Sequence, residues 1–235
     1  MTSVTAASFT ASPFDARGLV RGAEAISSDP GGAGSLEGLE GSFAVTGTNS
    51  ERVDYVSVSA AIPLGDFALG AGYDRLFRGS IRYQRTTIGI AGRLGHGLSL
   101  GMAYRYVDPI WTRASGRGVI DLGVLAEPAS WLSVSIGVDA LNSPRVGPER
   151  LGRSVKAGVF LRPIFGAPFV TFGGDGRLDV DAVRVEDARL LADVAVWQGT
   201  HALFGYAPDA HAVWVGMRLA FEGAEGRAAV APALL

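Results

Sequence analysis

Seven charged residues stand singly among small residues, each on the polar flank of a segment whose residue types alternate. They are Arg93, Arg105, Asp121, Asp139, Lys156, Asp193 and Arg218. Side chains of an extended chain alternate between two faces, so each charge lies opposite a flank of apolar residues. A charge among Gly, Ala and Ser suits a confined interior, where it must find a partner of opposite sign. We predict a luminal ladder of ion pairs; the alternative is a set of solvated charges on a soluble sandwich.

No group of residues has the spacing of a catalytic or metal site. His96, His201 and His211 lie ten or more positions apart, with no HExxH arrangement and no cysteine to complete a zinc site. His201 is the residue to inspect for acyl chemistry, but no G-x-S-x-G motif accompanies it. The acidic stretch 175–181 is a candidate calcium loop, for which a plain turn is the simpler interpretation. We therefore predict a protein that is not an enzyme and holds neither metal nor cofactor.

The composition excludes several classes of protein. Of 235 residues, 33 are glycine, roughly twice average usage, without a collagen period. The formal net charge of −2, with no basic run, argues against nucleic acid as a partner. The lack of cysteine excludes disulfides and suits a compartment outside the cytosol. No apolar run reaches the roughly 18 residues of a transmembrane helix, so a membrane protein with this sequence must be a barrel.

From about residue 41 the chain divides into extended segments separated by turn signals. The segments cover roughly 42–49, 52–62, 66–75, 80–94, 97–107, 117–126, 131–141, 152–162, 168–174, 180–197, 200–206 and 211–221. Short links occupy 63–66, 95–97 and 127–130, and longer links occupy 108–116, 142–151 and 174–179. Short turns at one rim and longer loops at the other are typical of bacterial barrels. We predict an all-β fold, an antiparallel up-and-down barrel of about 10–12 strands over 41–222.

The two flanks of each segment indicate which side faces lipid. In WLSVSIGVDALN, residues 131–142, one flank is Leu, Val, Ile, Val and Ala, and the other is Ser, Ser, Gly and Asp. Soluble sheets usually fill the polar face with long solvated side chains, whereas small residues suit a narrow interior. Aromatic residues near strand ends suit interface girdles, namely Tyr73, Tyr104, Tyr106, Trp111, Trp131, Trp197, Tyr206 and Phe221. We predict a transmembrane barrel of a bacterial outer membrane, with lipid as its surroundings.

The last segment resembles the terminal signal that outer-membrane barrels present to their insertion machinery. Gly216, Leu219 and Phe221 hold its glycine, apolar and final aromatic positions, while Trp214 stands where a polar residue is usual. The resemblance implies the barrel-insertion machinery as a partner. Residues 223–235 follow as a C-terminal tail.

The stretch ARGLVRGAEAISSDPGGAGSLEGLEGSF resembles the N-terminal region of the FadL and PorV type outer-membrane barrels. The matching order is an arginine-rich Gly-Ala segment, an acidic step and a Gly-Leu, although the Asn-Pro-Ala before that Gly-Leu is missing. In relatives this region sits inside or beneath the barrel, so the resemblance implies that residues 1–40, with a short helix around 17–27, form a luminal plug. The expected plug residues are Arg17, Arg21, Gly22, Asp29 and Pro30. The alternative is a flexible tail.

Three functions remain open from the sequence. PorV-like relatives imply a scaffold within an envelope machine for secretion or surface motility, with envelope proteins as partners. We favour this role because a short barrel filled by charges and a plug leaves little room for a substrate. The FadL resemblance implies the alternative, a transporter of a hydrophobic small molecule. The first residues show no basic and apolar signal-peptide pattern, which favours a third class, a soluble all-β binding module.

Overall fold

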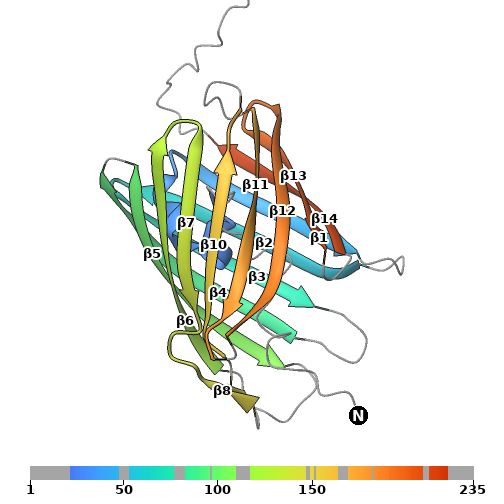
Figure 1. Ribbon diagram of the computed structural model, residues 1–235. Helices are drawn as coiled ribbons and strands as arrows, with labels where there is room; N and C mark the ends of the chain where they lie inside the picture. Colours follow the sequence, from blue (N-terminus) through green and yellow to red (C-terminus); the bar gives the residue numbers. More distant parts are fainter. Residues whose placement is uncertain are drawn as a thin grey trace, which may run out of the picture.

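A closed antiparallel β-barrel makes up most of the chain (Figure 1). The computed structural model describes residues 22–47, 53–76, 83–95, 97–109, 117–146, 149–150, 152–163, 169–181, 183–208 and 212–221. Within these residues, no helix is long and apolar enough to cross a bilayer.

The barrel contains twelve of the strands found in the described residues. They are β1 (Leu39–Gly47), β2 (Val53–Leu64), β3 (Phe67–Leu76), β4 (Tyr83–Gly95), β5 (Leu98–Pro109), β6 (Arg117–Ala129), β7 (Leu132–Asp139), β10 (Ser154–Leu161), β11 (Val170–Asp179), β12 (Arg184–Trp197), β13 (Thr200–Ala207) and β14 (Ala212–Phe221). Two short strands, β8 (Arg145–Val146) and β9 (Glu149–Arg150), form a separate sheet between β7 and β10. Because β1 pairs with β14, the ring closes, and the predicted fold class is confirmed.

Short turns gather at one end of the barrel, which we call the short-turn rim. Gly65, Gly97 and Gly199 lie in these turns with φ of 66°, 73° and 67°, a left-handed conformation that favours glycine. The turns bond to the next hairpin: the Gly97 carbonyl accepts from the Glu127 N–H at 2.7 Å. The opposite end, with the β7 to β10 connection, is the long-loop rim.

The apolar flank of each strand lies on the outside of the barrel. On β7, Ser133, Ser135 and Asp139 are buried in the interior, while Ile136 on the other flank is 55% exposed. Exposed aromatic side chains gather toward both rims. Phe67, Trp131, Phe169, Trp197 and Phe221 lie at the short-turn rim, and Tyr73, Tyr104, Tyr106 and Tyr206 lie toward the long-loop rim. Trp111 lies outside the described residues. The outer surface thus has the apolar belt and aromatic edges of a membrane barrel.

The helix predicted around residues 17–27 lies partly outside the described residues, which begin at Gly22. The described part of the chain has a single α-helical turn, α1 (Ala25–Ser28), and then a 3-10 helix, η2 (Pro30–Ser35), where we expected the helix to stop. Asp29 accounts for the continuation, because its side chain accepts a hydrogen bond from the Gly31 N–H at 3.3 Å. Pro30 then occupies the first position of η2, where proline is favoured.

The link predicted at 174–179 is instead part of β11. The glycine-rich run predicts a loop, but the ladder continues through it, pairing Gly174 with Leu190 and Asp175 with Arg189. Glycine weakens a strand mainly through its missing side chain, and here neighbouring side chains fill the space. The turn lies further on, where Val183 has φ of 50°.

Candidate functional site: the barrel lumen

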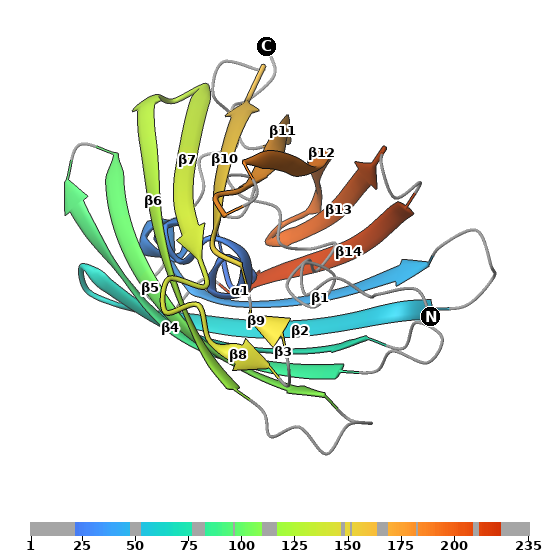
Figure 2. The ribbon, with the colours of Figure 1, turned by 60° about the horizontal axis from the view of Figure 1, so that its bottom comes forward.

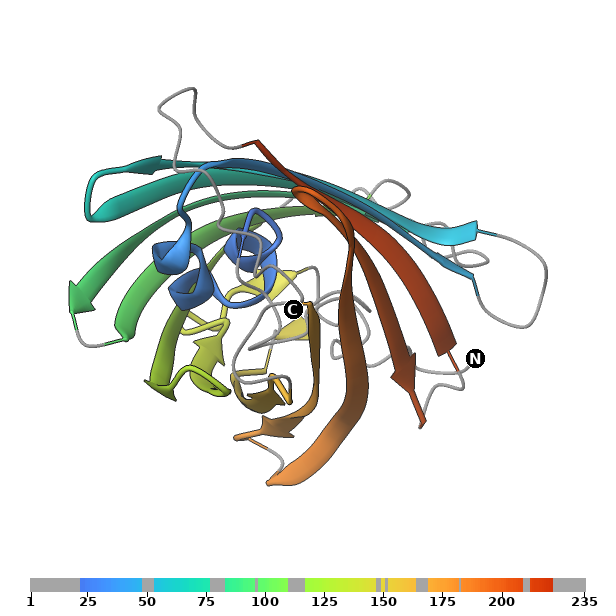
Figure 3. The same cartoon turned by 90° about the horizontal axis from the view of Figure 1, so that it is seen from above.

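Residues 22–36, which we call the plug, lie inside the barrel against the wall formed by β3 to β6 (Figures 2 and 3). Luminal glycines make room for it. A Cβ atom added at Gly101 would overlap the carbonyl oxygen of Pro30, and one added at Gly123 would overlap Asp29 Oδ1. Pro30 and Asp29 are both buried. The glycines therefore let the plug lie against the strands.

The α1 end of the plug fits the same wall. Ile26 is 1% exposed, and a Cβ atom at Gly70 would overlap its side chain. A Cβ atom at Gly72 would meet Ser27 Oγ in the same way. Of the predicted plug residues, Gly22, Asp29 and Pro30 lie inside the barrel, while Arg17 and Arg21 lie outside the described residues.

A band of charged side chains crosses the lumen on the long-loop side of the plug. On β3 and β4, Arg85 Nε donates to Asp74 Oδ2 at 2.5 Å, and both side chains are 1% exposed. Asp74 also accepts from Ser57 Oγ at 2.6 Å. Tyr55 completes the group, with its hydroxyl 3.5 Å from Arg85 Nη2. Opposite charges on adjacent strands therefore neutralise each other within the barrel.

The band continues across β5, β6, β7 and β10. Arg105 Nη2 donates to Asp121 Oδ1 at 2.6 Å. Lys156 Nζ lies 2.5 Å from Asp139 Oδ2, and Arg105 reaches the same oxygen at 4.0 Å. All four side chains are buried, so each charge depends on its partner rather than on water.

A second group of charges lies on the opposite wall, on β12, β13 and β14. We call Glu24, Asp193, His201 and Arg218 the Arg218 cluster. Arg218 Nη2 donates to Asp193 Oδ2 at 2.7 Å, and Arg218 Nη1 lies 3.5 Å from Glu24 Oε1. His201 Nδ1 lies 2.8 Å from Asp193 Oδ1. The cluster joins the start of the plug to the barrel.

The seven predicted ladder residues fall into different places. Arg105, Asp121, Asp139, Lys156, Asp193 and Arg218 are buried and ion-paired, in two groups rather than one continuous ladder. Arg93 is exposed, and its Nε donates to the Gly34 carbonyl of the plug at 3.3 Å. One group lies on β5 to β10 and the other on β12 to β14, with β11 between them in the barrel.

Sequence reasoning missed part of the charged band. Asp74 and Arg85 stand on the same flank as Gly72 and Thr87, so the alternation that identified the other charges would have found them. The pairing of Arg162 with Glu127 at 3.1 Å, at the short-turn rim, carried no such signal because both residues lie at strand ends.

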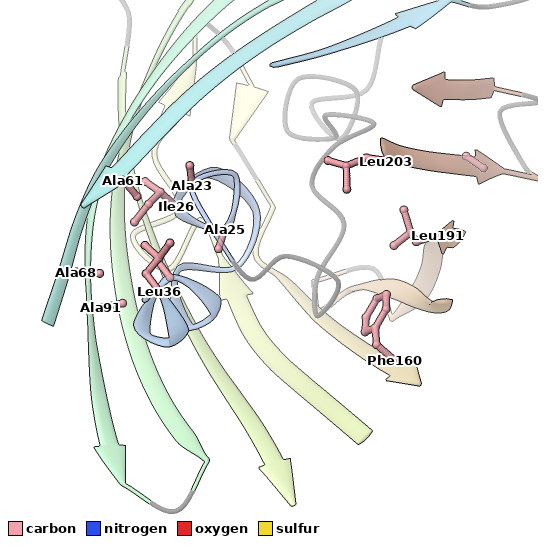
Figure 4. Packing of buried hydrophobic residues seen from close by; sticks show 12 residues of the cluster. Ala23, Ala25, Ile26, Leu36, Ala61, Ala68, Ala91, Phe160, Leu191 and Leu203 are labelled. Atoms are coloured by element: carbon pink, nitrogen blue, oxygen red, sulfur yellow. The ribbon is translucent and has the colours of Figure 1, made fainter. Parts of the chain in front are cut away.

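Large apolar side chains line the luminal wall of β10 to β13. Phe160, Gly173, Leu191 and Gly205 follow one another across these four strands as directly paired residues. Phe160 leans over Gly173, since a Cβ atom there would lie 2.7 Å from Phe160 Cδ1. Leu203 extends this apolar row on β13. Figure 4 shows Phe160, Leu191 and Leu203 on one side and the plug residues on the other.

The other candidate residues have structural contacts. Asp181 pairs with Arg153 at 3.1 Å and its N–H donates to Asp179 Oδ1, as expected of a turn. In the part of the chain that the structure describes, no group of three or more His, Cys, Asp or Glu side chains is placed to hold a metal. His96 and His211 lie outside that part.

The predicted insertion signal lies on the strand that closes the barrel. Gly216 faces the lumen beside Ala44 of β1, and Phe221 is 53% exposed at the short-turn rim. Leu219 is half-buried between them. Their recognition by insertion machinery remains a prediction.

Searches of protein-family models and of curated proteins found no match. Solved structures share the fold. A KdgM porin in complex with disordered oligogalacturonate aligns with TM-score 0.54 at 11% identity, over 77% of this chain and 99% of that one. The Ralstonia pickettii toluene transporter TbuX aligns with TM-score 0.52 at 8% identity, over 85% and 94%. The CymD monoaromatic hydrocarbon channel aligns with TM-score 0.52 at 9% identity, over 86% and 94%. The chain therefore has the barrel fold of outer-membrane channels.

Proposed function

We propose that the protein is an outer-membrane channel that passes small apolar molecules beside its plug. The observation that carries this proposal is the apolar row on β10 to β13. Phe160, Leu191 and Leu203 face the lumen there, whereas the wall under the plug presents mainly glycine and alanine. An apolar surface inside a barrel is what a solute with little polarity requires. The likeness to a toluene transporter and a hydrocarbon channel supports the same function.

The luminal charges favour an apolar solute over an acidic one. An oligosaccharide acid of the kind bound to the KdgM porin requires cations that are free to meet it. Here Arg85, Arg105 and Lys156 already hold carboxylates of the barrel wall. The transporter alternative from the sequence thus has more support than the scaffold. The scaffold role keeps one supporting observation, the plug that occupies part of the lumen.

Uptake of an apolar dye by whole cells tests the proposal. N-phenylnaphthylamine is an aromatic dye that an intact lipopolysaccharide leaflet excludes, so cells carrying the channel should take it up faster than cells without it. Leu191→Gln places an amide in the apolar row. We expect roughly tenfold slower uptake, since a polar group without a partner costs about 1–3 kcal/mol.

The control is Leu190→Ala, on the lipid-facing flank of the same strand, which should leave uptake unchanged. Heat-modifiable gel mobility verifies that each variant has folded. Uptake no faster than in cells without the protein would refute the channel. Stoichiometric envelope partners in the purified protein, together with no uptake, would favour the scaffold.

A further inference from the structure

The start of the plug carries a carboxylate that shares one arginine with the barrel wall. Glu24 Oε1 lies 3.5 Å from Arg218 Nη1, which is a long ion pair. Asp193 holds the same guanidinium more closely, with Oδ2 at 2.7 Å. Asp193 therefore already balances most of the positive charge of Arg218, and Glu24 is a second carboxylate beside it.

A further carboxylate adds negative charge at this point. Glu40 on β1 lies beside Gly22, where an added Cβ atom would overlap Glu40 Oε2. Glu24 Oε2 and Glu40 Oε2 are both buried without a hydrogen-bond partner. Three carboxylates thus surround one guanidinium, and His201 Nδ1 also lies 3.1 Å from Arg218 Nη2. The wall that α1 contacts on β2 to β4 presents small residues, including Ala61 and Gly70.

Burial, together with the surplus negative charge, makes the protonated form of Glu24 favourable. Burial raises the pKa of the Glu24 carboxyl above its ordinary value, and the opposing effect of Arg218 is smaller. A neutral carboxyl relieves the repulsion with Glu40 and Asp193. Glu24 Oε2 accepts no hydrogen bond, so no donor stabilises a negative charge on that oxygen.

We propose that Glu24 is the proton-binding residue of a latch that holds the start of the plug against β1, β12, β13 and β14. Protonated Glu24 keeps the plug docked, and loss of the proton releases its first turn. Release of the plug gates transport only under the proposed channel function. Docking of the plug does not depend on that function. A docked pKa above the free one means that docking is strongest below the free pKa and weakens as pH rises through the docked pKa.

Disulfide trapping measures docking without any transport assay. The chain has no cysteine, so a pair introduced as Ser27→Cys and Gly72→Cys reports one contact. A Cβ atom at Gly72 would lie 3.7 Å from Ser27 Cβ, which fits a disulfide. We expect the rate of trapping, divided by the rate of the same cysteine pair with Glu24→Gln at the same pH, to fall as pH rises from about 5 to about 8.5, by up to about tenfold per unit of pKa difference.

Glu24→Gln removes the titrating group, so docking of the plug in this variant should not change with pH. Each rate is divided by the rate of the Glu24→Gln protein at the same pH, which cancels the ionisation of the thiols. The matched control is Glu37→Gln, because Glu37 is an exposed glutamate just after η2. It should retain the pH dependence of the parent.

The latch is overturned if the rate of the parent, divided by that of the Glu24→Gln protein, does not change with pH. Maleimide labelling of Ser27→Cys alone, normalised in the same way, should rise with pH and provides a second measurement if the double variant folds poorly. Trapping that follows Glu24 while dye uptake is absent would support the latch and refute the channel. Dye uptake without Glu24-dependent trapping would support the channel and refute the latch.

Discussion

Arg105 stands between two carboxylates in the charged band. It pairs with Asp121 and lies 4.0 Å from Asp139, whose main partner is Lys156. Charges removed from water cost several kcal/mol each, and their attraction offsets this cost only while both partners are present. At the residue scale, the barrel interior therefore depends on complete pairs.

Arg105→Leu should lower the free energy of unfolding by about 3–5 kcal/mol, because it leaves Asp121 buried without its guanidinium. Urea titration in vesicles, followed by gel mobility, measures the change. A second variant, Arg105→Leu with Asp121→Leu, should recover much of the loss, since no buried charge is then orphaned.

The control is Arg153→Leu. Arg153 pairs with Asp181 at 3.1 Å, but both side chains are about half exposed, at 49% and 46%. An exposed pair contributes less than about 1 kcal/mol. Equal losses from Arg105→Leu and Arg153→Leu would contradict the buried role of the band.

At the scale of elements, the plug packs closely against β3 to β6 because glycines on that wall have no side chains. The glycine at 101 lies under the Pro30 carbonyl, and the glycine at 123 lies under Asp29. Close-packed interiors tolerate added volume poorly, so small residues on this wall are a condition for docking. The high glycine content of the chain has part of its explanation here.

Gly101→Val should displace η2 from the wall and weaken docking by about 1–3 kcal/mol, the usual cost of overpacking. Hydrogen exchange at plug amides would rise, while the strands stay protected. In the matched variant Gly41→Val, the new Cβ meets only the Ser59 carbonyl oxygen at 3.8 Å. Unchanged exchange in Gly101→Val would show that the plug does not depend on this contact.

At the scale of the molecule, the apolar flanks form one outer belt. A soluble sandwich would pack these flanks against each other, yet Ile88 is 58% exposed and its counterparts on neighbouring strands are similar. Exposed apolar area of this extent requires lipid or a partner. The belt and its aromatic edges support the membrane location that the channel function needs.

Two substitutions on one strand test the belt. Ile88→Arg, near the middle of β4, should cost about 2–4 kcal/mol of stability in a bilayer. Leu94→Arg lies on the same flank but at the rim, and should cost about 0–1 kcal/mol. Refolding into lipid vesicles measures both. Equal effects at the two positions would argue against a membrane along this axis.

The barrel class, the outward flank and the inward position of isolated charges can be predicted from the residues alone. These follow from the two-residue alternation of a strand, which is a local property that each segment carries within itself. The sequence limited the strand number to about 10–12, and closure of the barrel sets it at twelve. The plug was inferred from a resemblance, and its exact helices were not, because Asp29 and Pro30 extend the turn through η2.

Which charged groups meet depends on how the strands are placed in the folded barrel. The register of β3 against β4 brings Asp74 to Arg85. The alternation of residue types within one strand does not indicate which charges pair. Glu24 reaches Arg218 across 194 positions of sequence, because the barrel closes β14 beside β1 and the plug folds back inside. Contacts of this kind depend on the relative placement of distant strands, and no periodicity within one segment encodes that placement.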